Sequence, residues 1–360
     1  MKKLVVLLMT FAMTFSLLTA CGSSTDNAPA NNQPAANSTS NGSGSDGGAT
    51  KENPHIWKVG TSAGLVNGKH VIYDLILKIE EEVESATDGR YQIEPYHSSQ
   101  LGSDRDTIEG TAMGTYQITV VPGTFCGAYV DNFNVFEFPY LFESADHFFD
   151  TMESDVAAEI GAELEAYDLH WLGNGMNGIL SAMNSKREIR TVDDFRGLKL
   201  RVIDSPMQVG AMECLGAQGT VVNWGETYTA CQQNTIDGVI TTGSGFLSGK
   251  IHEVSKYHTA ANIFMTPISV VMNLNYWNSL PAEDQQLIQD AVTRALQWHR
   301  ETAVDGLNAD LASSIEEGGI ANVTYDEFDH DAAIAAMEPL YAKYEAQYGE
   351  LFARVRAVAD

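Results

Sequence analysis

The chain has 360 residues, 44% of them hydrophobic, and its 48 acidic and 21 basic side chains give a formal net charge of −27. A protein this acidic is repelled by the phosphate backbone, which excludes nucleic acid as a partner. An anionic lipid surface would repel it for the same reason, which disfavours membrane binding through a basic patch.

The first 20 residues have the pattern of a secretory leader. Two lysines precede an apolar stretch from Leu4 to Leu18, which is too short to span a membrane. Cys21 directly follows Leu-Thr-Ala, an arrangement that resembles the bacterial lipobox. The resemblance implies cleavage before Cys21 and a lipid anchor on its sulfur, at the extracytoplasmic face of the cell membrane. A secreted protein with a chance cysteine there is the alternative. Without its two lysines the net charge becomes −27 − 2 = −29.

A low-complexity segment follows the leader. Residues 22–50 are mostly Ser, Asn, Gly, Ala, Pro, Thr and Asp, a composition that cannot form a core. We expect residues 21–52 to be a disordered, lipid-anchored tether, and the rest of the chain is long enough for two lobes. Its three cysteines, Cys126, Cys214 and Cys231, are too few for a disulfide framework. One pair could bridge, but small buried hydrophobic residues are the favoured interpretation.

Strands and helices alternate along the remaining chain. Periodicity predicts strands at 56–60, 90–96, 117–121, 169–172, 179–183, 198–202, 220–222 and 238–241. It predicts helices at 70–86, 103–113, 206–215, 225–233, 281–303 and 331–358, with a turn or short helix at 192–195. Short strands with helical crossovers indicate an α/β fold with parallel sheets. The run Gly-Asn-Gly-Met-Asn-Gly at 173–178 lacks dinucleotide-binding spacing and is interpreted as a loop between strands.

The loop after the first strand carries a weak catalytic motif. Residues 60–64 match the G-x-S-x-G pattern around Ser62, but no convincing histidine element follows, so a hydrolase is disfavoured. A Gly-rich loop at the end of a first strand more often lines a ligand crevice, and Asn67 and His70 near its end are candidate ligand contacts. The chain has no HExxH, CxxC, EF-hand or P-loop spacing, and the acidic run 326–331 is interpreted as a solvated turn. We therefore predict neither a metal site nor a cofactor.

Arg201 lies on a strand whose apolar residues alternate with charged ones. On a period of two, Arg201 shares a face with Lys199. The pattern allows two interpretations. Arg201 is either a surface residue on an exposed strand face or a fixed guanidinium that offers two hydrogen bonds to a carboxylate.

Several motifs occur in a characteristic order between Trp57 and Leu340. They are Ser99-Gln100-Leu101-Gly102, Phe138-Pro139-Tyr140-Leu141-Phe142, Asn184-Ser185-Lys186, Gly197-Leu198-Lys199-Leu200-Arg201-Val202, Leu215-Gly216-Ala217, Glu226-Thr227-Tyr228-Thr229-Ala230 and Ile236-Asp237-Gly238. This series resembles the solute-binding proteins of tripartite ATP-independent periplasmic (TRAP) transporters, the DctP family.

The resemblance implies a type II periplasmic-binding-protein-like fold, with two α/β lobes, a central ligand cleft and a long connecting helix. We expect lobe I to comprise 53–177 plus 266–305, and lobe II 178–265 plus 306–360. The resemblance also implies that Arg201 pairs with the carboxylate of a small organic acid, which the protein delivers to membrane permease subunits driven by an ion gradient. Such a protein is not an enzyme. A ligand-binding sensor for a signalling partner shares the fold and is the alternative.

Two positions depart from the family pattern. Thr241 stands where many members have a ligand-contacting Asn, and Leu180 stands where many have a second Arg. The loss of a positive group and an amide argues against a dianionic ligand. A monocarboxylate, a hydroxy acid or an acid with an apolar body is expected instead. Trp224, Tyr228 and Phe246 could form the apolar wall, or could simply pack in the core or at the rim.

Overall fold

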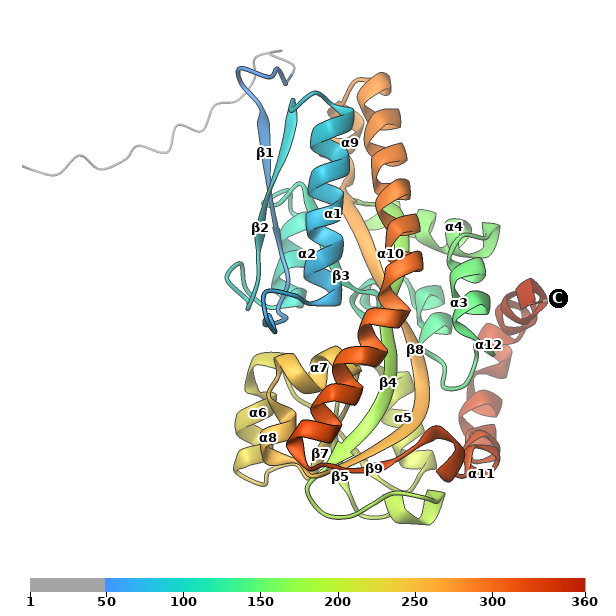
Figure 1. Ribbon diagram of the computed structural model, residues 1–360. Helices are drawn as coiled ribbons and strands as arrows, with labels where there is room; N and C mark the ends of the chain where they lie inside the picture. The colour runs from blue at the N-terminus through green and yellow to red at the C-terminus, as the bar shows by residue number, and fades with distance from the viewer. Residues whose placement is uncertain (1–48, 360) are drawn as a thin grey trace, which may run out of the picture. The chain divides into compact units, whose positions relative to one another are not determined.

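The computed structural model describes residues 49–359, which belong to one compact unit. The predicted leader, Cys21 and nearly all of the predicted tether lie outside the described residues. The fold begins with strand β1 (His55–Gly60), helix α1 (Val71–Ala86) and strand β2 (Tyr91–Tyr96), and the two strands pair in parallel (Figure 1). Leu75, Ile79 and Val83 are buried on one face of α1, as their spacing of four predicts.

A second, larger sheet has seven strands in the order β3-β8-β4-β7-β5-β6, with β9 also paired to β8. The strands are β3 (Ile118–Pro122), β4 (Leu169–Asn184), β5 (Lys199–Val202), β6 (Gln218–Val221), β7 (Gly238–Thr241), β8 (Tyr257–Asn273) and β9 (Ala321–Val323). Strand β5 is parallel to β6 and β7, and β8 is parallel to β9, whereas β4 is antiparallel to both β7 and β8 and β3 is antiparallel to β8. The expectation of parallel sheets is therefore wrong for half of this sheet, because three of its strand pairs, β3–β8, β4–β8 and β4–β7, are antiparallel.

The predicted loop at 173–178 is also wrong. Strand β4 runs unbroken through it, and its pairing with β8 shifts register beside Gly173, Gly178 and Ala182. Gly173 and Gly178 have φ values of +146° and +143°, which side chains rarely adopt. They allow β-bulges inside a continuous strand, so these glycines mark bends rather than a loop.

The helices after α1 are α2 (Asp104–Ala112), α3 (Ala145–Met152), α4 (Asp155–Ala162), α5 (Pro206–Cys214), α6 (Trp224–Gln232), α7 (Gly243–Ser248), α8 (Ile251–Val254), α9 (Leu274–Ser279), α10 (Ala282–Gly318), α11 (His330–Ala336) and α12 (Glu338–Arg356). Helices α1, α2, α5 and α6 match their predicted ranges, whereas α3, α4, α7, α8 and α9 were not predicted. Helix α10 extends well beyond the predicted end at 303, to 37 residues. The predicted helix at 331–358 is two helices, and α12 begins at Glu338 with Pro339 in its first turn.

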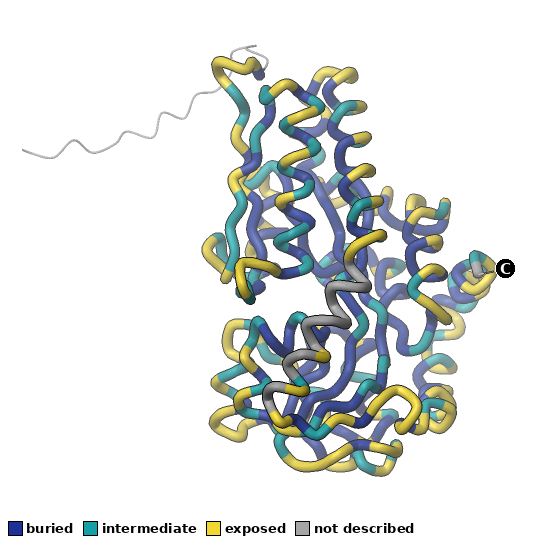
Figure 2. The backbone as a smooth tube through the Cα atoms, in the orientation of Figure 1, coloured by how far each residue is buried: buried dark blue, intermediate teal, exposed yellow. Residues whose placement is uncertain are grey.

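Three apolar clusters form the core, and the buried residues follow the long strands in Figure 2. One cluster joins β1, β2, α1 and the start of α10, and all its members from Trp57 onward lie within the predicted lobe I. A smaller one joins β7, α7 and α8 within the predicted lobe II, and the largest has members from both ranges. The division into lobes thus stays a prediction.

A buried ion pair joins the first sheet to α10. Asp284 accepts hydrogen bonds from Arg90 Nη1 at 2.5 Å and from the Tyr91 hydroxyl at 2.6 Å. Both oxygens of this carboxylate therefore have a strong donor. Cys126, Cys214 and Cys231 are free thiols, the first and last buried, as expected for small hydrophobic residues.

Candidate functional site

A cavity of about 70 Å³ lies where the loop after β1, the start of α2 and the ends of β5 and β7 meet. Its lining consists of Ser62, Ala63, His70, Ile72, Asp104, Pro122, Asn177, Arg201, Ile203, Trp224, Thr241, Thr242 and Gly245. An adjoining hollow of about 100 Å³ shares Ser62, Asp104, Arg201, Ile203 and Trp224 and extends past Arg105 and Asp204. The two hollows together form the candidate ligand site.

Arg201 is the positive centre of this site. It lies on β5, opposite Thr220 of β6 and Val239 of β7, and only 7% of its surface is exposed. Its Nε donates a hydrogen bond of 2.9 Å to the Val222 carbonyl. Within residues 49–359 no carboxylate is in ion-pair contact with it, so its terminal nitrogens are left for another acceptor. Burial lowers its pKa to about 10, with the charge of Asp104 opposing that shift, so it stays positive at neutral pH.

Trp224 forms one wall beside the guanidinium. It begins α6, and the Arg201 Cζ lies 5.3 Å from the centre of its ring, which is cation–π contact. The indole approaches the backbone at Gly249 so closely that a Cβ there would be 2.8 Å from it. The glycine at position 249 therefore leaves room for the Trp224 ring beside Arg201.

Asp104 is the negative centre of the site and comes from the first turn of α2. Its Oδ1 accepts from the Ser62 backbone N–H at 3.1 Å and its Oδ2 from the Ser62 hydroxyl at 2.5 Å. Burial raises the pKa of this carboxyl group, while the Ser62 hydrogen bonds and the nearby Arg201 charge oppose the rise. The helix N-terminus also favours a negative charge here.

Hydroxyl and imidazole groups complete the lining. Thr241 ends β7, and a Cβ on Gly245 would lie 2.5 Å from its hydroxyl, so α7 can begin this close only with a glycine. The Thr242 hydroxyl caps α7 by accepting from the Gly245 N–H at 3.1 Å. His70 caps α1 through Nδ1, which accepts from the Ile72 N–H, and burial lowers its pKa to about 4. The imidazole is therefore neutral in the site at neutral pH.

Four of the predicted ligand contacts, Arg201, Trp224, Thr241 and His70, thus line one cavity. The other four lie elsewhere in this structure. Phe246 and Leu180 are buried in two different apolar clusters. The Tyr228 hydroxyl donates to Glu253 at 3.1 Å, and Asn67 lies in an exposed turn with φ +51°. For all eight residues, contact with a ligand stays a prediction.

Sequence reasoning missed three polar residues of the cavity. Asp104 follows the Gln-Leu-Gly motif in an ordinary helix start, which gave no sign of a ligand contact. Asn177 was hidden in the run predicted as a loop, and Thr242 next to Thr241 was not considered. The Gly-rich segment at 60–64 was expected to line a ligand crevice, and Ser62 and Ala63 do line the cavity.

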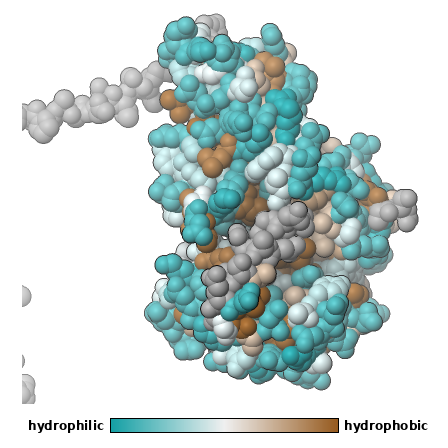
Figure 3. Space-filling model, in the orientation of Figure 1, coloured by the Kyte–Doolittle hydropathy of each residue, from teal (hydrophilic) through white to brown (hydrophobic). Residues whose placement is uncertain are grey.

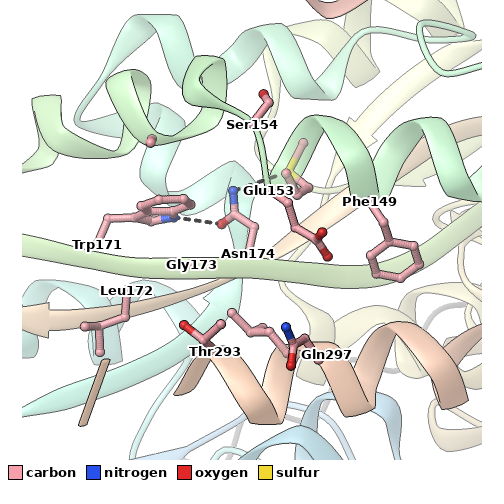
Figure 4. A pocket seen from close by; sticks show the side chains of 12 residues that line it. Phe149, Glu153, Ser154, Trp171, Leu172, Gly173, Asn174, Thr293 and Gln297 are labelled. Atoms are coloured by element: carbon pink, nitrogen blue, oxygen red, sulfur yellow. Dashed lines mark hydrogen bonds between the residues drawn. The ribbon is translucent and has the colours of Figure 1, made fainter. Parts of the chain in front are cut away.

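A larger cavity of about 310 Å³ lies between α3, α4, β4 and α10. In Figure 4, Trp171 and Asn174 project from one side of β4, and Thr293 and Gln297 of α10 lie beyond its other side. Asn174 already bonds to Trp171, Ser269 and Met152, and the charged residue of this lining, Glu153, is exposed and paired with Arg300. We place the candidate site by its chemistry rather than its volume, at Arg201.

Comparison with known proteins settles the family. Residues 63–347 match the DctP family, described as bacterial extracellular solute-binding protein, family 7. This chain belongs to the DctP family of TRAP transporter solute-binding proteins. These are the ligand-binding components of transporters and not enzymes, so the hydrolase interpretation of Ser62 has no support.

The relatives cover nearly all of the described fold. The sialic acid-binding periplasmic protein SiaP of Vibrio cholerae is 28% identical over 281 residues, which are 78% of this chain and 86% of that protein. A TRAP solute-binding protein from Pseudomonas putida F1, solved with D-glucuronate, is 25% identical at a TM-score of 0.77, covering 84% of this chain and 97% of its own. Another, from Sulfitobacter sp. NAS-14.1 with β-D-galacturonate, is 25% identical at a TM-score of 0.75, covering 84% and 98%.

The DctP family consists of bacterial extracellular proteins. The face drawn in Figure 3 is mainly hydrophilic, with hydrophobic side chains in small patches. None of the described helices is both long and apolar enough to cross a membrane.

Proposed function

We propose that this protein captures a small organic acid by its carboxylate at Arg201 and delivers it to the membrane permease subunits of a TRAP transporter. The observation that carries the proposal is a buried guanidinium that lacks a carboxylate partner in the described part of the chain. A buried charge without a partner is unfavourable, and a ligand carboxylate would supply the missing charge and two parallel hydrogen bonds.

The relatives support this ligand class. Sialic acid, D-glucuronate and β-D-galacturonate, which appear in the descriptions of three relatives, each carry one carboxylate and several hydroxyl groups. The candidate site offers one buried positive charge, and its remaining lining is rich in hydroxyls, with Ser62, Thr241 and Thr242. A single anchoring charge matches a monocarboxylate.

The cavity draws its residues from both predicted lobes, which supports a closing mechanism. Ser62, His70 and Asp104 belong to the predicted lobe I, and Arg201 and Trp224 to the predicted lobe II. We propose that the ligand joins the two sets, that closure removes water from the ion pair, and that the permease recognises the closed form. Attachment through a lipid on Cys21 would hold the protein at the outer face of the membrane.

A ligand panel tests the binding function. In a thermal-shift assay, D-glucuronate, D-galacturonate or a related sugar acid at 100 times its dissociation constant should stabilise the protein by about 2.7 kcal/mol. Arg201→Met should abolish the shift. Arg196→Met, which removes an exposed arginine that pairs with Asp193 on the surface, should retain the shift. Shifts by uncharged sugars or amines, with none by acids, would exclude the proposal.

The anchor needs its own experiment. Cys21→Ala should move the protein from the membrane fraction to the soluble fraction of the producing cells. If the variant stays with the membranes and the wild type carries no lipid by mass spectrometry, the anchor proposal is wrong and the binding proposal is unaffected.

A further inference from the structure

The site contains a buried carboxylate that the anchoring role of Arg201 does not explain. Asp104 is 7% exposed, and its only hydrogen-bond donors within the described chain are the two groups of Ser62. A carboxylate can accept about four hydrogen bonds. Asp104 therefore keeps acceptor capacity, and it lines both hollows of the site together with Arg201.

The two hydrogen bonds from Ser62 fix the orientation of the Asp104 carboxylate. The backbone N–H and the hydroxyl of one residue hold one oxygen each, so the carboxylate cannot rotate away from the cavity without losing both bonds. Because Asp104 is 7% exposed, water solvates its negative charge poorly, and this burial raises the pKa of the carboxyl group. A ligand group that donates hydrogen bonds would improve that solvation, and a second negative charge would oppose it.

We propose that Asp104, held by Ser62, determines specificity: it accepts hydrogen bonds from hydroxyl groups of the ligand and excludes acids with a second carboxylate. This rests on the proposed function, in which Arg201 binds the first carboxylate. Hydroxyls suit the site better than an ammonium group, because each can donate to Asp104 and also accept from Asn177 or Thr242 in the same lining.

Matched acids test the proposal. D-glucuronate and D-glucarate share their carbon chain length but carry one and two carboxylates, and D-erythronate and tartrate form a second such pair. In calorimetric titrations at pH 7.5, the wild type should bind the better monocarboxylate at least about 100-fold more tightly than its dicarboxylate partner, since juxtaposed like charges cost several kcal/mol. Asp104→Asn should reduce that ratio at least about tenfold.

Control variants distinguish a failure of the role of Asp104 from a failure of the proposed function. Glu109→Gln removes a half-exposed carboxylate from the same helix and should leave the ratio unchanged. Asp104→Ser serves as a second variant if Asp104→Asn unfolds. Equal binding of both acids by the wild type, tight binding of an amino acid with its ammonium group, or an unchanged ratio in Asp104→Asn would each overturn the role of Asp104. Acids that bind equally well to Arg201→Met would instead overturn the proposed function.

Discussion

Two carboxylates in this protein are buried almost equally but have different surroundings. Asp284 is 4% exposed and Asp104 is 7% exposed. Asp284 has a guanidinium on one oxygen and a phenol on the other. The donors are Tyr91, the first residue of β2, and Arg90 just before it, so Asp284 connects a helix to a sheet. Within the described residues, Asp104 has hydrogen bonds from Ser62 alone, and the buried cation of the same site, Arg201, bonds to a carbonyl instead. Burial alone therefore does not indicate that a charged group is functional. A buried charged group that lacks an oppositely charged partner is the better indication.

Removing the Asp284 carboxylate should have the largest effect on stability. Asp284→Asn leaves Arg90 without its counter-charge in a mostly buried position, and we expect a loss of about 3 kcal/mol of unfolding free energy. Chemical denaturation measures it. The affinity for the acid ligand should not change. If the variant lost affinity and kept its stability, Asp284 would have a role in binding rather than in the fold.

A third buried carboxylate, Glu137, tests whether unpaired charges lower stability. It accepts a hydrogen bond from Gln208 at 3.1 Å, and burial raises its pKa from 4.5 to about 7. Because the folded pKa exceeds the unfolded one, this group reduces stability as the pH rises from about 4.5 to 7, by on the order of 2 kcal/mol.

Glu137→Gln should therefore flatten the fall of unfolding free energy over that pH range, as measured by denaturation at several pH values. Glu143→Gln, at an exposed position of the chain, is the matched control and should keep the wild-type slope. Identical slopes in the Glu137 variant and the wild type would show that this carboxyl group titrates normally.

Replacing Arg201 should separate binding from stability. Arg201→Met removes a buried charge that has no carboxylate in contact, so the unliganded protein should keep its stability or gain about 1 kcal/mol. Ligand affinity should be lost in the same variant. A destabilised variant would mean that Arg201 supports the fold as Arg90 does.

The smallest effect should come from an exposed ion pair at the edge of the site. Arg105 of α2 lies 2.5 Å from Asp204, which precedes α5, and the side chains are 45% and 59% exposed. Arg105→Ala should weaken ligand binding by about fivefold or less, and added salt should reduce the difference. A large, salt-independent loss would indicate direct contact between Arg105 and the ligand.

Local patterns predicted the outer part of the fold well. The spacing of Leu75, Ile79 and Val83 identified α1, since one face of that helix is buried and the other faces solvent. Strand β8 was missed because residues 266–273 are buried without any alternation. The centre of β4 was mistaken for a loop because Gly173 and Gly178 at bulges have the same composition as turn residues.

The sequence predicted those residues of the candidate site that belong to a recognisable pattern. Arg201, Trp224 and His70, which line the candidate cavity, were predicted from a characteristic strand, an aromatic position and a Gly-rich loop. The bond between Ser62 and Asp104 joins residues 42 positions apart and has no sequence signature. Aromatic character could not distinguish Trp224, which faces the cavity, from Phe246, which is in the core, because both positions are apolar and only the packing decides.

The two long strands have a consequence for how the protein unfolds. Strand β4 contributes Leu172 to one apolar cluster, Met176 to the largest and Met183 to the third, and it pairs with β8 over most of its length. None of the three clusters can unfold without exposing part of β4, so thermal unfolding should be a single cooperative transition. Amide hydrogen exchange should be slowest along β4 and β8. A destabilising substitution in an apolar cluster far from the site would then reduce transport because fewer molecules are folded. The ligand affinity of each molecule that stays folded would not change.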